Sequence, residues 1–208
     1  MIEHSQLNAP LYFIRHGETD WNIKRRFQGQ SDIPLNPHGF EQAAANGKIL
    51  SGLLKKDDKP AQHYNFVSSP LSRASKTMEL VLAELGLPEE NYQTDAALTE
   101  ISFGLWEGLT SPEAKQQYYH ERQKRRKDRW NIAPPGGESF AERTGTIEQF
   151  LLGLPANSVV VSHSGIMRII IQLLKNLAPL DAVNVEISHV GVHFWDGKAL
   201  CLAKNDNE

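Results

Sequence analysis

Short runs of apolar residues alternate along the chain with longer segments in which apolar residues recur at every third or fourth position. The clearest runs are Leu11 to Ile14 and Val159 to Val161, where no polar residue interrupts the series. Such continuous runs are typical of strands buried on both faces of a parallel sheet, whereas the three-to-four spacing predicts amphipathic helices. We therefore expect an α/β fold.

Capping and turn residues indicate where these elements begin and end. Asn36 suits the cap of a helix and Pro37 its first position, and Asp196-Gly197 is a typical hairpin turn between two β-favourable runs. The predicted strands cover 11–14, 65–68, 92–94, 158–162, 190–195 and 198–203, and the predicted helices 37–54, 70–85, 138–152 and 166–177. Together they predict a three-layer sandwich, with helices on both faces of a mostly parallel central sheet and a C-terminal antiparallel hairpin.

Charged and polar residues follow three of the predicted strands. Arg15 and His16 end the first strand, Arg73 lies shortly after the second, and His163 follows the strand at 158–162. Ligands of such sheets bind beyond the carboxyl ends of the strands, and Gly17 allows the backbone to turn sharply there. Guanidinium and imidazole groups that converge on one site need an anionic partner. Phosphate is the natural candidate, since arginine binds tetrahedral oxyanions through charge-assisted hydrogen bonds.

Composition narrows the class of partner. The 208 residues fit a single domain over 1–208, without an internal repeat or a Gly/Ser linker. A formal net charge of −3 argues against a nucleic-acid or membrane surface and favours a small-molecule partner. Neither a secretory signal nor an apolar run of about 20 residues is present, so we expect a cytoplasmic protein. The lone Cys201 suits a reducing compartment, and we expect it to be a small buried hydrophobe.

Two other uses of the histidines and serines fit the sequence poorly. The H-x-E pattern at 16–18 resembles that of zinc deaminases, but a chain with one cysteine lacks the P-C-x-x-C that those enzymes require. The segment Ser162 to Gly165 lacks the glycine two residues before serine that forms a nucleophile elbow. We expect no metal, and we interpret the remaining six histidines as structural: His4, His38, His63, His120, His189 and His193.

The blocks that carry these residues resemble the histidine phosphatase superfamily, also called phosphoglycerate mutase-like. RHGETDWN with its continuation RRFQGQSDIPLNPHGFEQA resembles the opening block, and SSPLSRASKT, LTEISFGLWEG, PGGESF and VSHSGIMR follow in the family's order over nearly the whole chain. The resemblance implies an α/β fold with helices on both sides of a central sheet. It also implies phosphoryl transfer through a phosphohistidine, without a metal or another cofactor.

The resemblance also implies roles for individual residues. His16 would be the nucleophile that attacks phosphorus, which splits the transfer into two easier steps. Arg15, Arg73 and His163 would bind the phosphoryl oxygens and stabilise the charge of the transition state. Glu100 would protonate the leaving oxygen and later activate the water that hydrolyses the phosphohistidine.

Four further positions belong to the substrate-binding set that the resemblance implies. Asn22 and Gln28 would hydrogen-bond the phosphoryl group from the flanking loop, although ordinary side-chain-to-backbone bonds are an alternative for both. Gly17 would contribute through its backbone. Ser164 stands where many family members have glycine, and its hydroxyl either touches the substrate or caps the helix that starts at Gly165.

Two features leave alternatives open. Glu18 and Glu107 are the other carboxyl groups that could replace Glu100 as the acid. The basic run from Arg122 to Arg129 is expected to be a solvated helix face. Because the equivalent region of the family lies over the active site, the alternative is a basic lid that favours substrates with more than one anionic group.

The overall prediction is a metal-independent phosphomonoester hydrolase that acts on a small phosphorylated metabolite. A cofactor-dependent phosphoglycerate mutase is the alternative enzyme, but mutases of this type usually carry an ERHYG-like block where this chain has LTEISFGLWEG. A phospho-ligand-binding module without catalysis is the alternative outside the enzymes.

Overall fold

The structure, a computed structural model, describes residues 3–56 and 59–204 and is built around a central sheet. The sheet has six strands in the order β3-β2-β4-β1-β5-β6. The strands are β1 (Leu11–Arg15), β2 (Asn65–Ser68), β3 (Gln93–Thr94), β4 (Ser158–Ser162), β5 (Val192–Trp195) and β6 (Leu200–Ala203). Strands β3, β2, β4 and β1 pair in parallel, and β5 and β6 are antiparallel to their neighbours. The predicted mostly parallel sheet with its C-terminal hairpin is confirmed.

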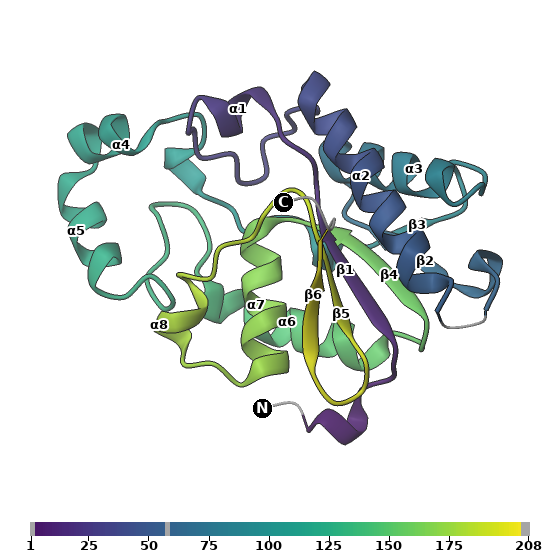
Figure 1. Cartoon of the computed structure of the whole chain (residues 1–208). Coiled ribbons are helices and arrows are strands. Elements are labelled where there is room, and N and C mark those ends of the chain that lie inside the picture. Colours follow the sequence, from purple (N-terminus) through teal and green to yellow (C-terminus); the bar gives the residue numbers. More distant parts are fainter. Residues whose placement is uncertain (1–2, 57–58, 205–208) are drawn as a thin grey trace.

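Helices cover both faces of the sheet (Figure 1). The principal ones are α2 (Pro37–Leu54), α3 (Ser72–Glu84), α6 (Phe140–Gly153) and α7 (Ser164–Lys175). Successive side chains of a strand point to opposite faces. Accordingly, Leu11 and Phe13 of β1 pack with buried residues of α6 and α7, whereas Tyr12 and Ile14 pack with those of α2 and α3. Two apolar cores therefore hold β1 from both sides and fix where its carboxyl end lies.

Short helices and loops gather beyond the carboxyl end of β1 (Figure 1). They include α1 (Asp20–Ile23), α4 (Ser111–Gln117), α5 (Tyr119–Lys127) and the 3-10 turns η3 (Ala96–Leu98) and η4 (Gly104–Trp106). The remaining short elements are η1 (His4–Gln6), η2 (Ala61–His63) and α8 (Pro179–Ala182). The expectation that the basic run is a solvated helix face is only partly right, since Lys124 and Arg126 of α5 are exposed but Arg125 is buried.

The helix starts show where capping was predicted correctly and where it was not. The Asn36 side chain accepts a hydrogen bond from the Gly39 N–H (2.8 Å), which confirms it as the cap of α2. The predicted cap at Ser164 is wrong, because α7 begins one residue earlier, with Ser164 as its first residue and His163 as its cap. Ser164 is thereby moved into the first turn, where its side chain lines a cavity described below.

The expectation for Cys201 is also wrong. This residue lies on β6, an edge strand of the sheet, and it is exposed. A side chain on an edge strand is covered by a neighbouring strand on one side only, so an apolar-looking run there does not ensure burial. Within the described ranges 3–56 and 59–204, no helix is long and apolar enough to cross a membrane.

Candidate active site

The residues that follow the predicted strands meet at the carboxyl edge of the sheet. A cavity of about 160 Å³ lies there, and seven of the nine predicted site residues line it: Arg15, His16, Asn22, Gln28, Arg73, Glu100 and Ser164. The His163 ring lies next to the His16 ring, with centroids 5.0 Å apart. The ninth, Gly17, packs so tightly against the Gly39 carbonyl that a Cβ there would collide with it. The structure thus brings all the predicted residues into one region.

Hydrogen bonds fix the state of the His16 imidazole. Its Nδ1 lies 2.7 Å from the Gly17 carbonyl oxygen. A carbonyl only accepts, so Nδ1 carries the proton and Nε2 keeps a free lone pair. The backbone N–H of His16 donates to the Ser162 carbonyl (2.9 Å), which ties the residue to the end of β4. The His16 ring is therefore held with its Nε2 lone pair available.

Burial keeps both imidazoles of this region neutral. His16 is 3% exposed, and burial lowers its pKa well below the usual histidine range, with further lowering by His163, Arg73 and Arg15. Burial likewise lowers the pKa of His163, and Arg73 and Arg15 add to the effect. A neutral imidazole is the nucleophilic form, so His16 needs no separate base to deprotonate it at neutral pH.

Two guanidinium groups stand near His16. Arg73 is fully buried and donates to the carbonyls of Ser31 and Gly29 (both 2.8 Å), while Arg15 donates to the Ile187 carbonyl (2.6 Å). Burial lowers the pKa of Arg15 to about 10 and also lowers that of Arg73. With a pKa of about 10, Arg15 remains charged at neutral pH.

Three buried nitrogens around His16 lack a partner. Among the described residues, Arg15 Nε, Arg73 Nε and His163 Nδ1 form no hydrogen bond, although His163 Nε2 bonds the Ser69 hydroxyl at 2.7 Å. Buried polar groups are normally paired, and a set of them left open at one place indicates a ligand with several acceptor atoms. A phosphoryl group has that composition, since its oxygens can accept from all sides.

Glu100 lines the same cavity. Its carboxylate accepts hydrogen bonds from the backbone N–H groups of Ile101 (3.0 Å) and Gly165 (3.1 Å), and the residue is 7% exposed. The bond to Gly165 is made at the first turn of α7, where helix N–H groups lack intrahelical partners. A Cβ at Gly165 would collide with the Glu100 carboxylate, so this glycine leaves room for that side chain.

The two alternative carboxyl groups are occupied elsewhere. Glu107 accepts from Gln30 N, Ser31 N and hydroxyl, Ser102 hydroxyl and Phe103 N at 2.7 to 3.2 Å, which ties the loops together. Glu18 accepts from the Asn36 side chain (3.1 Å) at the start of α2. Neither Glu18 nor Glu107 lines the cavity, which leaves Glu100 as its one carboxyl group among the described lining residues.

The flanking loop contributes two amides. The Asn22 Oδ1 accepts from the backbone N–H and the hydroxyl of Thr19 (both 3.0 Å), so its amide nitrogen is the group left for a ligand. Gln28 is 8% exposed, and its Oε1 has no partner among the described residues. Asn22 therefore makes the local side-chain-to-backbone bond that was its alternative interpretation, and it also lines the cavity.

His189, which the sequence analysis interpreted as structural, contacts His16, and the sequence did not predict this contact. Its Nδ1 lies 2.8 Å from the His16 carbonyl oxygen, and the two rings are 5.7 Å apart. Asn46 of α2 holds this segment through hydrogen bonds with His189 O (2.8 Å) and Gly191 N (2.7 Å). No local pattern at 189 signals a partner 173 positions away. Within the described residues, no group of three His, Cys, Asp or Glu side chains is placed to hold a metal ion.

Comparison with known proteins agrees with this geometry. Residues 11–206 match the histidine phosphatase superfamily (branch 1). The 2,3-bisphosphoglycerate-dependent phosphoglycerate mutase of Beijerinckia indica subsp. indica is 30% identical over 184 residues, which cover 85% of this chain and 86% of the relative.

Solved structures give a complementary picture. A mycobacterial glucosyl-3-phosphoglycerate phosphatase in complex with VO3 has a TM-score of 0.73 and 25% identity, covering 94% of this chain and 97% of the other. A candidate alpha-ribazole-5'-P phosphatase from Escherichia coli K-12 has a TM-score of 0.77 and 26% identity, covering 95% of each chain.

The chain belongs to the histidine phosphatase superfamily, branch 1. It is an enzyme of that superfamily, a phosphatase or a mutase, and the family acts on small phosphorylated substrates.

Proposed function

We propose that this protein is a metal-independent phosphomonoester hydrolase that works through a phosphohistidine on His16. The observation that carries the proposal is the set of unpartnered buried nitrogens on Arg15, Arg73 and His163 around a neutral imidazole whose Nε2 is free. The two guanidinium nitrogens, together with His163 Nδ1 when the Ser69 hydroxyl donates to Nε2 and Nδ1 carries the proton, match the equatorial oxygens of a phosphoryl group in transfer, and the His16 imidazole supplies the attacking atom.

The reaction would proceed in two steps. In the first, His16 Nε2 forms a bond to phosphorus, the bond from phosphorus to the leaving oxygen breaks, and Glu100 gives that oxygen a proton. In the second step, water attacks the phosphohistidine and returns a proton to Glu100, which releases inorganic phosphate and restores His16.

Each remaining predicted residue has a supporting task in this scheme. Asn22 and Gln28 would bind phosphoryl oxygens or the bridging oxygen from the loop, and Ser164 would offer a hydroxyl from the first turn of α7. Gly17 would allow the backbone behind His16 to approach Gly39. We propose that the whole domain, 1–208, works in the cytoplasm with a small phosphomonoester as its partner and without a cofactor.

A phosphoglycerate mutase is the second candidate, because the curated relatives with about 30% identity are named as such enzymes. The phosphatase is favoured by the LTEISFGLWEG block, which differs from the ERHYG-like block of mutases, and by neighbours in structure that are named as phosphatases. A mutase must keep its phosphohistidine from water, whereas a phosphatase must admit water.

The test is an assay of both monophosphoglycerates and of a panel of phosphorylated metabolites. We expect release of inorganic phosphate, with kcat/KM ranking the substrates, and little conversion of one phosphoglycerate into the other. Interconversion that outpaces phosphate release would contradict the hydrolase and establish the mutase. Binding of phosphorylated ligands without either reaction would establish a non-catalytic module.

A further inference from the structure

Glu100 stands on a stretch of chain that has no regular structure of its own. Residues 99–103, between η3 and η4, form neither helix nor strand. Such a backbone is not stiffened by a ladder of internal hydrogen bonds, so its shape depends on the partners of its N–H and C=O groups. We call residues 97–102 the Glu100 segment. The position of the Glu100 carboxylate depends on what holds this segment.

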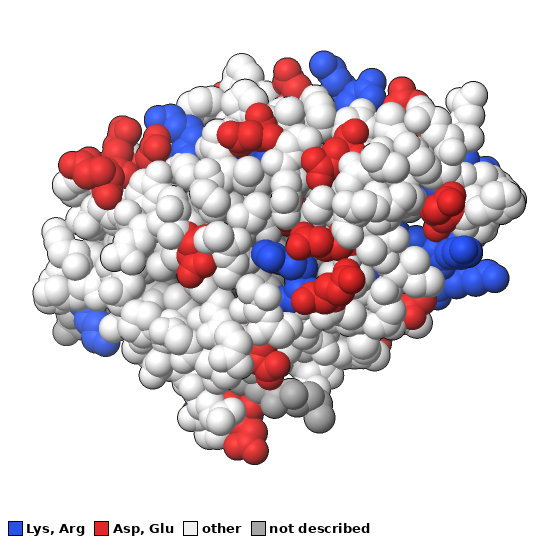
Figure 2. Space-filling model, turned by 180° about the vertical axis from the view of Figure 1, so that it is seen from behind, with Lys and Arg blue, Asp and Glu red and all other residues white. Residues whose placement is uncertain are grey.

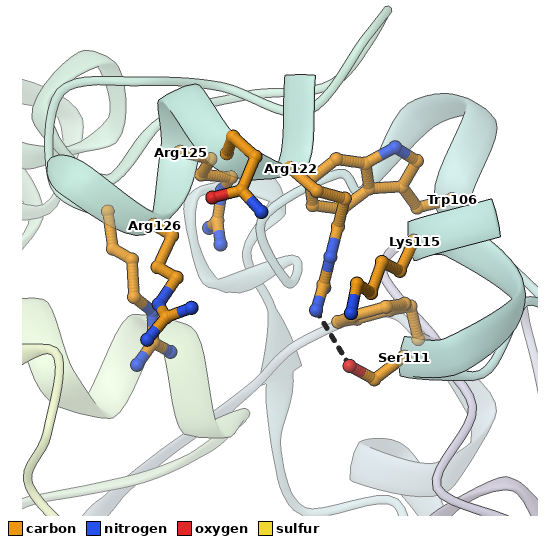
Figure 3. Close-up of a pocket in the computed structure, with 9 residues that line it drawn as sticks. Trp106, Ser111, Lys115, Arg122, Arg125 and Arg126 are labelled. Carbon is orange, nitrogen blue, oxygen red and sulfur yellow. Dashed lines mark hydrogen bonds between the residues drawn. The ribbon is translucent and has the colours of Figure 1, made fainter. Parts of the chain in front are cut away.

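The chain that follows the Glu100 segment is closely packed. A Cβ on Gly104 would collide with backbone atoms of residues 135–137. Trp106, the last residue of η4, is buried, and Arg122 of α5 lies over its ring with its Cζ 5.3 Å from the ring centroid. Figure 3 shows Trp106 and Arg122 in the wall of a cavity of about 420 Å³. This packing fixes the downstream end of the segment.

Arg143 of α6 holds the upstream half of the segment. Its Nη2 donates to the carbonyls of Ala97 (2.8 Å) and Thr99 (3.1 Å). The Ser162 hydroxyl donates to the carbonyl between them, that of Leu98 (2.8 Å). Hydrogen bonds from a charged donor are stronger than those between neutral groups. One guanidinium nitrogen that bridges two carbonyls therefore fixes the backbone just ahead of Glu100.

Glu138, which precedes α6, holds the downstream half. Its Oε2 accepts from the Ser102 N–H (2.9 Å) and from the Gln30 side-chain amide (3.3 Å), and its own N–H donates to the Ser102 carbonyl (2.9 Å). The same Gln30 amide also donates to the Glu100 carbonyl (3.2 Å). The backbone on both sides of Glu100 is thus held by charged side chains at the start of α6.

Arg143 differs from an ordinary surface cation. Figure 2 shows charged side chains of both signs interspersed over the back of the molecule. The Arg143 side chain is only 15% exposed, and its Nη1 lies 3.9 Å from Glu138 Oε1, which is too long for a hydrogen bond. Its Nε has no partner among the described residues. Removing a guanidinium from water costs free energy, and the Glu100 segment receives the short hydrogen bonds that Arg143 makes in return.

We propose that Arg143 is a positioning residue for the general acid: together with Glu138, it fixes the Glu100 segment so that the Glu100 carboxyl group stands at the leaving oxygen. This inference rests on the proposed hydrolase function and on the role of Glu100 in it. Arg143 is not among the residues that line the cavity, so it acts through the backbone of residues 97–99. A proton donor works only within hydrogen-bond reach of the leaving oxygen, which makes its position critical.

The test uses a double-mutant cycle and two leaving groups. Arg143→Met removes both donors and keeps an apolar stem, and it is combined with Glu100→Gln. Gln149→Ala is the control, because Gln149 is an exposed polar residue of the same helix. Each variant is assayed for kcat/KM with p-nitrophenyl phosphate, whose phenolate leaves unaided, and with the alkyl phosphate that wild type hydrolyses best.

We expect a loss that depends on the leaving group. Arg143→Met should lower kcat/KM roughly 10- to 100-fold for the alkyl phosphate, on the scale of a displaced catalytic group, and less than about threefold for p-nitrophenyl phosphate. The double variant should lose no more for the alkyl phosphate than Glu100→Gln alone, because the position of the acid is irrelevant once the acid is gone. The Gln149 control should match wild type with both substrates.

Retained turnover of p-nitrophenyl phosphate shows that a variant is folded. If Arg143→Met does not fold, Arg143→Lys takes its place in the cycle, since lysine keeps the charge but lacks the planar fork of donors. The lysine variant should show the same dependence on the leaving group to a smaller extent.

Two results would overturn the inference while leaving the hydrolase intact. The first is an Arg143 variant that loses nothing or loses equally with both substrates, although Glu100→Gln is selective. The second is a pair of losses that multiply in the double variant, which would show that Arg143 acts independently of Glu100. Absence of turnover by wild type with every phosphomonoester would instead contradict the proposed hydrolase, and the inference with it.

Discussion

At the scale of single residues, the site depends on how His16 is held. Its imidazole is fixed by the Gly17 carbonyl, and its own carbonyl accepts from His189. Burial lowers the pKa of His189 to about 4, so that side chain is neutral at neutral pH and donates through Nδ1–H. We infer that His189 is a positioning residue, which acts on the reaction through the backbone of His16.

Substitution of His189 tests this positioning role. His189→Ala should lower kcat roughly 10- to 100-fold with little change in KM, because a small displacement of the nucleophile disturbs its alignment. His189→Asn should recover much of the loss, since an amide N–H can donate to the same carbonyl. Steady-state kinetics of both variants give the kcat and KM values that test this expectation. Equal losses in the two, or a loss in KM alone, would show that the contact with His16 O is unimportant for catalysis.

The proposed role of Glu100 as the general acid can be tested with substrates whose leaving groups differ. Glu100→Gln should lower kcat/KM roughly 10²- to 10⁴-fold for an alkyl phosphate, whose alkoxide leaves poorly without a proton. The loss should be much smaller for p-nitrophenyl phosphate, whose phenolate leaves unaided. The comparison uses kcat/KM, which excludes a slow second step that follows loss of the leaving group. Similar losses for both substrates would remove Glu100 from the role of acid.

At the scale of elements, the sequence predicts those parts that pack through apolar residues. The strands β1 and β4 are buried apolar runs, and the start of α2 is marked by Asn36. The contacts of the short helix α5 could not be predicted, because α5 has no apolar stripe that would pack against the rest of the protein. Arg122 and Arg125 pack it onto Trp106 and Phe103 instead, and the sequence alone shows these residues only as charges.

In the site, too, some residues could be placed from the sequence pattern and others only from the fold. Arg15, His16 and His163 could be predicted to meet, because the carboxyl ends of neighbouring parallel strands lie at the same edge of a sheet. His189 could not, since it lies between the last helix and β5 and reaches His16 only through the fold. The predicted start of α7 was one residue too late, which made Ser164 the expected cap. Residue types specify the exact end of a helix only weakly, because the boundary depends on backbone angles.

The start of α2 is the element whose contribution to stability is most easily measured. Asn36→Ala removes the acceptor for the Gly39 N–H and the donor to Glu18, and should lower the free energy of unfolding by about 1 kcal/mol. Asn36→Ser keeps a capping oxygen and should lose less. Urea denaturation of the two variants measures the difference. If both were as stable as wild type, the cap would contribute nothing.

At the scale of the whole molecule, the sheet brings cationic and imidazole groups to one end, and in the proposed mechanism these groups supply the charge stabilisation that a bound metal ion would otherwise provide. Activity should therefore survive EDTA. Vanadate should inhibit, because its oxygens mimic the transferring phosphoryl group that Arg15, Arg73 and His163 would surround. Assays after exhaustive dialysis against chelator check both points. Activity lost on chelation and restored by a divalent cation would refute the metal-independent mechanism.

The most direct test of the account is detection of the phosphoenzyme. Wild type mixed with a ³²P-labelled substrate and quenched within the first turnovers should carry label that is stable in base and labile in acid, as expected of a phosphohistidine, and peptide mapping should place it on His16. His16→Ala should retain its fold and carry no label. Label on another residue, or near-normal turnover by His16→Ala, would contradict the assignment of His16 as the nucleophile.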